Sequence, residues 1–175
     1  MVRLLLLGLG LGLALGACGD DSSVPPEDFG GCDGLVEVVA NEPGVHMPVG
    51  SHIDWSSNPP AVGAHYATWA GWNRHYQSLD RAYYVHNLEH GGIVIQYGDR
   101  VSQAERDKLN AYYDKDPVGI LMAPLPRIGP RIAVTAWTHL MVCQKVDTKA
   151  FDTFKKKYRF KGPEKIPADQ MQPGQ

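Results

Sequence analysis

The segment between residues 41 and 75 is rich in proline, glycine, asparagine and serine, which limits the regular structure that it can form. The run Asn58-Pro59-Pro60 restricts the backbone angles, whereas Gly50 and Gly63 permit tight turns. We therefore expect ordered loops and short strands in this segment, and longer elements only from Asp80 onward.

Asp80 is suited to be the N-cap of a helix that runs through His90 and stops at Gly91-Gly92. The apolar run 93–97 then predicts a mostly buried strand. The other predicted elements are a helix capped by Ser102 and ending near Asp114, strands at 118–122 and 131–137, and a helix capped by Asp147. The proline-rich loop between these two strands predicts that they form an antiparallel pair.

This order of elements predicts an α+β fold, in which helices pack against a small mixed sheet. The His-, Pro- and Trp-rich loops of the N-terminal part would close one end of the domain.

The first residues carry a targeting signal. Arg3 precedes an apolar run from Leu4 to Leu15, long enough for the core of a signal peptide and too short to span a bilayer as a helix. The run ends in Leu15-Gly16-Ala17-Cys18, which resembles a bacterial lipobox whose cysteine becomes acylated. We expect export and lipidation at Cys18, so that the membrane is a partner through the N-terminal lipid.

Four regions follow from these patterns: a lipoprotein signal peptide (1–17), an acidic, proline-containing tether (18–28), one globular domain (29–162) and a flexible tail (163–175). The expected location is the cell envelope, on the periplasmic or outer-surface side. The formal net charge of −2, with basic and acidic residues interspersed, argues against a nucleic-acid partner.

Two cysteines remain when Cys18 is assigned to lipid. Cys32 and Cys143 are an even pair in an oxidising compartment, which favours a disulfide. Two buried thiols are the alternative. A thiolate metal ligand has no Cys-x-x-Cys or close Cys-His spacing to support it.

Six of the seven histidines lie between residues 46 and 90. The densest part is His86-Asn87-Leu88-Glu89-His90, in which two imidazoles four residues apart would share one face of a helix. Neutral imidazole is the commonest protein metal ligand. Hydrogen-bonded packing of these rings around tryptophans is the alternative that needs no metal.

Several longer motifs resemble the bacterial domain of unknown function 3105 family, which is found largely in exported or membrane-tethered proteins. The motifs that carry the resemblance are Val45-His46-Met47-Pro48-Val49-Gly50, Asn58-Pro59-Pro60, Gly63-Ala64-His65-Tyr66 with Trp69, Val85 to Gly92, and Ile132 to Trp137. Ala61-Val62 departs from the Thr-Ser that is usual there. The resemblance implies a fold and singles out His46, His65, His86 and His90, but implies no activity.

These four imidazoles suit a transition metal, for which we predict copper or zinc. The expected ligands are His65, His86 and His90, with His46 as the fourth. Glu89 and Asp54 would be second-shell acceptors that hold the rings in the correct tautomer. The expected role is storage, delivery or structure, without turnover.

Two other functions stay open. The motif also matches the His-x-x-Glu-His pattern of inverted zinc peptidases, in which Glu89 would activate water and Glu164 could supply a downstream ligand. A module that binds an envelope partner through aromatic side chains between Trp55 and Tyr84 would need no metal. A large exposed apolar patch would favour this third function, whereas converging imidazole nitrogens would favour the metal.

Overall fold

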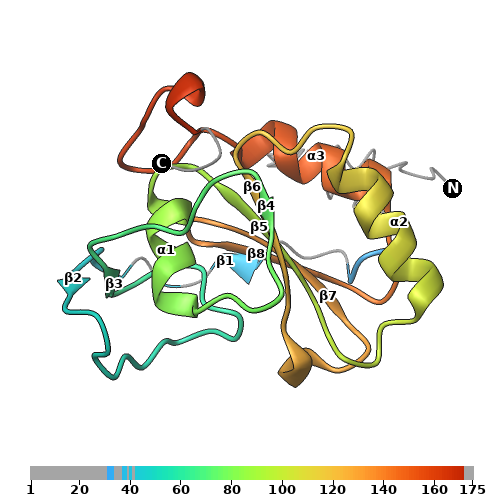
Figure 1. Cartoon of the computed structure of the whole chain (residues 1–175), viewed down its shortest axis with the longest axis horizontal. Helices are drawn as coiled ribbons and strands as arrows, with labels where there is room; N and C mark the ends of the chain where they lie inside the picture. Colours follow the sequence, from blue (N-terminus) through green and yellow to red (C-terminus); the bar gives the residue numbers. More distant parts are fainter. Residues whose placement is uncertain (1–30, 34–36, 39, 41, 172–175) are drawn as a thin grey trace, which may run out of the picture.

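The computed structural model describes residues 31–33, 37–38, 40 and 42–171, and Figure 1 shows the whole chain. The expected signal peptide, the tether and Cys18 lie outside the described residues. Within the described ranges, no helix is both long and apolar enough to cross a membrane.

The centre of the fold is a mixed sheet, which confirms the predicted α+β class. Its strands pair in the order β1-β8-β7-β5-β6-β4. Their bounds are β1 (Glu37–Val38), β4 (Arg74–His75), β5 (Ile93–Tyr97), β6 (Ile120–Pro124), β7 (Ile132–Ala136) and β8 (His139–Cys143). β5 and β4 run parallel to β6, while the remaining pairs are antiparallel.

The predicted antiparallel pairing of 118–122 with 131–137 is wrong, because β5 lies between β6 and β7. β5 is buried over Ile93 to Gln96, and the backbone N–H and C=O groups of a buried strand need partner strands on both edges. The proline-rich connection, with its 3₁₀ turn η1 (Pro126–Ile128), therefore crosses from one side of β5 to the other.

Helices cover both faces of the sheet (Figure 1). Successive side chains of a strand point to opposite faces. Ile93 and Ile95 pack with α2 (Gln103–Tyr113) and α3 (Thr148–Tyr158), whereas Val94 packs with α1 (Arg81–Glu89). Two apolar cores thus lie on either side of one central strand, and of the α-helices in the described residues α1 alone covers its face of the sheet.

The three helices begin at their predicted caps. Asp80 accepts a hydrogen bond from the Ala82 N–H at 2.9 Å, which fixes the start of α1. Ser102 and Asp147 cap α2 and α3 in the same way. Each cap satisfies a backbone donor that the first turn of a helix leaves unpaired.

The segment between residues 41 and 75, which we call the loop segment, forms a second, two-stranded sheet from β2 (His46–Met47) and β3 (His65–Tyr66). The two strands are parallel, with His46 opposite His65. The expectation of ordered loops and short strands in this part of the chain is confirmed.

The two ends of the described chain are attached to the domain. Cys32 is joined to Cys143 of β8 by a disulfide. Residues 163–171, which we call the C-terminal segment, belong to the expected flexible tail, yet Met171 is fully buried in the core around Trp72. Asn73 Nδ2 also donates to the Met171 carbonyl at 2.6 Å. Residues 172–175 lie outside the described residues.

Candidate metal centre

The last turn of α1 carries three ionisable side chains at helical spacing, His86, Glu89 and His90. All three are buried, with 3%, 5% and 7% of their surface exposed. Residues three and four apart lie on the same face of a helix. Val85 and Leu88 pack α1 onto the sheet. The polar face of α1 therefore points away from the sheet, toward the loop segment.

β2 and β3 bring two further imidazoles to the helix. The His65 N–H donates to the Val45 carbonyl at 3.0 Å, and the register places His46 and His65 opposite each other. Their ring centroids are 5.1 Å apart, and each lies 4.8 Å from the centroid of the His86 ring.

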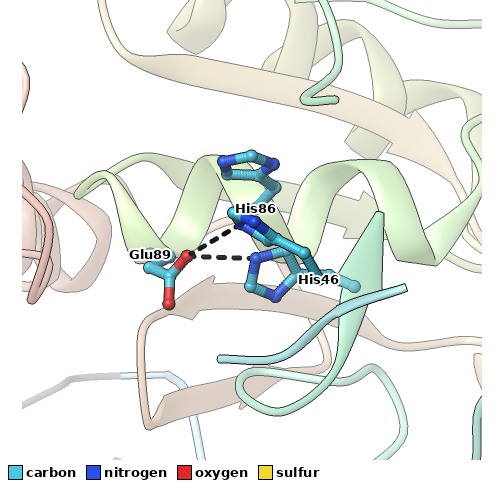
Figure 2. Close-up of side chains that lie close together, drawn as sticks. His46, His86 and Glu89 are labelled. Carbon is cyan, nitrogen blue, oxygen red and sulfur yellow. Dashed lines mark ion pairs between the residues drawn. The ribbon is translucent and has the colours of Figure 1, made fainter. Parts of the chain in front are cut away.

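Four residues form what we call the histidine site: His46, His65, His86 and Glu89. One potential ligand atom from each lies within 4.8 Å of the others. Glu89 Oε2 is 3.0 Å from His65 Nε2 and 3.9 Å from His46 Nε2, and Figure 2 marks these ion pairs with dashed lines. In this view Glu89 extends from α1 toward the ring of His46.

Backbone carbonyls fix the tautomer of three rings. His65 Nδ1 lies 2.9 Å from the Gly63 oxygen, and His86 Nδ1 lies 2.8 Å from the Tyr66 oxygen. His90 Nδ1 is likewise 2.8 Å from the carbonyl oxygen of Glu164. A carbonyl only accepts, so each Nδ1 must donate, and the Nε2 of each neutral ring keeps a bare lone pair. This is the usual arrangement of a metal-binding histidine and its supporting acceptor.

His86 and His90 make an unusual contact, because their Nε2 atoms are 3.0 Å apart. With both Nδ1 atoms donating to carbonyls, these two Nε2 atoms repel each other at this distance unless a proton or a metal ion lies between or beside them. His90 is not one of the four residues of the histidine site, but its ring contacts the ring of His86, which is.

Burial controls the charge of the central ring. Removal from water lowers the pKa of His86 to about 4, since the charged form loses hydration. The Tyr66 carbonyl opposes this shift, while neighbouring imidazoles add to it. His86 is therefore neutral at neutral pH, the state in which imidazole binds metals.

Two atoms of the site lack a hydrogen-bond partner in the described part of the chain. They are His65 Nε2 and Glu89 Oε2, which face each other in a geometry that makes no hydrogen bond. Burying a carboxylate oxygen without a hydrogen bond costs free energy. A cation between these atoms would remove that cost.

Asn87 attaches the histidine motif to a neighbouring loop. Its fully buried amide accepts from the Ala70 N–H and donates to the Ala70 carbonyl, both at 2.9 Å. This pair places Trp69 edge-on to His86 and His90, with ring centroids 5.3 and 5.1 Å away. Trp69 thus forms one wall of the site.

Glycines allow two close approaches to the site. At Gly44 a Cβ atom would collide with the Glu89 carboxylate, so a larger residue there would require the carboxylate to move. At Gly162 a Cβ atom would overlap the carbonyl of Glu89 at the end of α1. The C-terminal segment can therefore approach closely enough for Glu164 N–H to donate to that carbonyl at 3.1 Å.

The structure brings together most of the residues that the sequence singles out. His46, His65 and His86 converge, and His90 contacts His86. Glu89, expected to support the ligands from outside, lies directly among their nitrogens.

Asp54 does not lie at the site, so the prediction that it holds a ligand ring is wrong. Its carboxylate lies 3.1 Å from His52 Nε2, and both side chains are exposed, at 92% and 87%. An acceptor that orients a ligand must contact the ligand ring, and in the described residues backbone carbonyls do this instead.

Sequence reasoning missed the supporting groups. The carbonyls of Gly63, Tyr66 and Glu164 carry no side-chain signature, since every residue has a backbone oxygen. Asn87 had a signal, because it lies inside the motif on a helix whose interior disfavours asparagine.

The comparisons with known proteins give one family. The family described as "Protein of unknown function (DUF3105)" matches residues 46–170, a range that includes all four residues of the histidine site. Neither a curated protein nor a solved structure matches the chain. The chain belongs to the DUF3105 family.

Proposed function

We propose that this protein binds one transition-metal ion, copper or zinc, at His46, His65, His86 and Glu89, with His90 beside them. Its role would be to store, deliver or be stabilised by the ion at the outer side of a membrane, to which the acyl group on Cys18 attaches it.

The observation that carries this proposal is the convergence of three imidazole rings on a buried carboxylate. The Nδ1 atoms of His65 and His86 are committed to carbonyls, so both rings present Nε2 to the same small space as Glu89. The 3.0 Å contact between His86 and His90 adds a second repulsion that a cation would relieve.

The donor set supports copper or zinc. Three imidazoles and a carboxylate suit Zn²⁺ and Cu²⁺, and imidazole disfavours Mg²⁺ and Ca²⁺. A thioether from Met47, Met122 or Met141 would favour Cu⁺. Met122 and Met141 fill the core beneath α2 and α3, whereas Met47 follows His46 in β2 and is partly exposed.

The two alternative functions receive less support. In a peptidase Glu89 would activate water, yet its carboxylate lies 3.0 Å from His65 Nε2, as a ligand would. Glu164 contributes its backbone, and its side chain is exposed. An aromatic docking module would need a large exposed apolar patch, but in the described residues Trp72 and Tyr84 are fully buried and the exposed large apolar side chains are Val45 and Val49.

Elemental analysis tests the proposal. The mature protein, purified without a histidine tag and loaded with zinc or copper, should retain about one ion per chain after desalting. His65→Ala and His86→Ala should lose it, whereas His52→Ala should keep it, because His52 is exposed and paired with Asp54. Equal metal content in all four proteins, or none in the wild type, would refute the site.

Attachment to the membrane is tested separately. Metabolic labelling with a radioactive fatty acid should mark the wild-type protein, and Cys18→Ser should abolish both the label and membrane fractionation. A membrane-bound, labelled Cys18→Ser protein would contradict the lipid anchor.

A further inference from the structure

The residues of the histidine site differ strongly in exposure. The side chain of His46 is 48% exposed, whereas those of His65 and Glu89 are 0% and 6% exposed. His86 is buried as well. An ion at the site would therefore face solvent on the side of His46.

The residues also differ in how firmly they are held. The rings of His65 and His86 are fixed by carbonyls, and the elements that carry them, β3 and α1, pack against each other. Within the described residues, no backbone carbonyl holds the His46 ring. His46 contacts Glu89 and the rings of its neighbours instead.

The strand that carries His46 is the more easily displaced one. β2 has two residues and pairs with β3 alone in its sheet. It leads into an exposed turn closed by the Ser51 N–H and the Pro48 carbonyl, 3.1 Å apart. Val45 and Val49 on either side are 49% and 67% exposed, so little apolar packing opposes movement of this segment.

We propose that His46 is the ligand through which the ion is exchanged. An incoming donor atom, from a small chelator or another protein, bonds to the ion as the bond from the His46 imidazole breaks. His65, His86 and Glu89 hold the ion meanwhile. The imidazole leaves neutral and the ion keeps its charge, so the step needs no proton or electron. This inference rests on the proposed metal site.

Transfer of zinc to a coloured chelator tests the exchange. The zinc-loaded wild type should release the ion at a rate that rises with chelator concentration, because the chelator takes part in the step. His46→Ala should still bind zinc, but should release it at least about 10-fold faster, since affinity differences between related complexes lie mostly in the dissociation rate. His65→Ala should retain no ion, and His52→Ala should release zinc as the wild type does.

The outcomes separate the two proposals. A wild type without zinc would refute the metal site itself. If the wild type binds zinc but His46→Ala releases it no faster, or cannot hold it at all, the site stands and the exchange role of His46 is wrong.

A measurement without substitution gives a second test. Diethyl pyrocarbonate modifies accessible imidazoles. During chelator-driven release from the wild type, modification of His46 should precede that of His65 and His86 when followed by mass spectrometry. Modification of the buried rings first, or of all three together, would show that the site opens from another side.

Discussion

Asn87 shows how a single buried amide can determine the position of a functional motif. Its two hydrogen bonds to Ala70 join α1 to the loop that carries Trp69. Replacing it by leucine should leave both backbone groups of Ala70 unpaired and lower the free energy of unfolding by roughly 2–4 kcal/mol. Urea unfolding measures the effect.

The control for Asn87→Leu is Gln103→Leu, at an exposed position in the first turn of α2. This change should shift stability by less than about 0.5 kcal/mol. Equal effects of the two substitutions would mean that the amide does not connect the helix to the loop.

His86 gives the metal-free protein a pH-dependent stability. Its pKa is about 4 in the folded protein and near 6.5 in the unfolded chain, so only the unfolded chain binds the proton between these values. Its contribution is therefore intact above pH 6.5 and is lost as the pH falls toward 4, at no more than about 1.4 kcal/mol per pH unit.

Urea unfolding of the metal-free protein between pH 7 and pH 4.5 should show this loss. His86→Gln removes the titrating group and should flatten the profile, whereas His52→Ala should keep the wild-type slope. A profile as steep in His86→Gln as in the wild type would assign the dependence to another group.

At the scale of elements, α1 and β5 show what the sequence predicts well. Asp80 and Gly91 mark the ends of the helix because their chemistry suits a cap and a positive φ, here +88° at the glycine. The mostly apolar run 93–97 coincides with the bounds of β5. The histidine spacing on α1 likewise predicts that His86 and His90 share one face.

Strand pairing and the supporting carbonyls could not be predicted in this way. β5 lies between β6 and β7 in the sheet. The order of three apolar strands in a sheet is not specified by the local sequence pattern. The contact of Glu164 with His90 joins residues 74 positions apart through a backbone oxygen. Asp54 looked suitable because it is acidic and close in sequence to histidines, but its loop leaves it in solvent.

The junction between α1 and the C-terminal segment depends on Gly162. A methyl group there would overlap the Glu89 carbonyl, so Gly162→Ala should push the C-terminal segment off the helix and cost roughly 1–3 kcal/mol. Limited proteolysis should then cleave within residues 163–171. Gly31→Ala is the control, since its Cβ would meet only one atom, at the ordinary contact distance of 3.6 Å. Unchanged cleavage in Gly162→Ala would contradict the close packing.

For the whole molecule, the disulfide between Cys32 and Cys143 connects positions 111 residues apart. A cross-link that closes so long a loop restricts the unfolded chain, and its removal should cost about 2–5 kcal/mol. The variant with both cysteines changed to serine should unfold at lower urea than the oxidised wild type. Addition of reductant should destabilise the wild type and leave the variant unaffected. Identical midpoints for oxidised wild type and variant would contradict a stabilising bond.

The parallel pairing of β2 with β3 decides when an ion can first be held. Parallel strands cannot be joined by a tight turn. His46 therefore meets His65 only after the chain between them has wrapped around, and the four-residue site is complete only when α1 also contacts β3. A chain that crosses a membrane unfolded has not yet formed this pairing. Under the proposed export and metal binding, it would collect its ion only where it folds, and its metal occupancy would reflect the metal supply of that compartment.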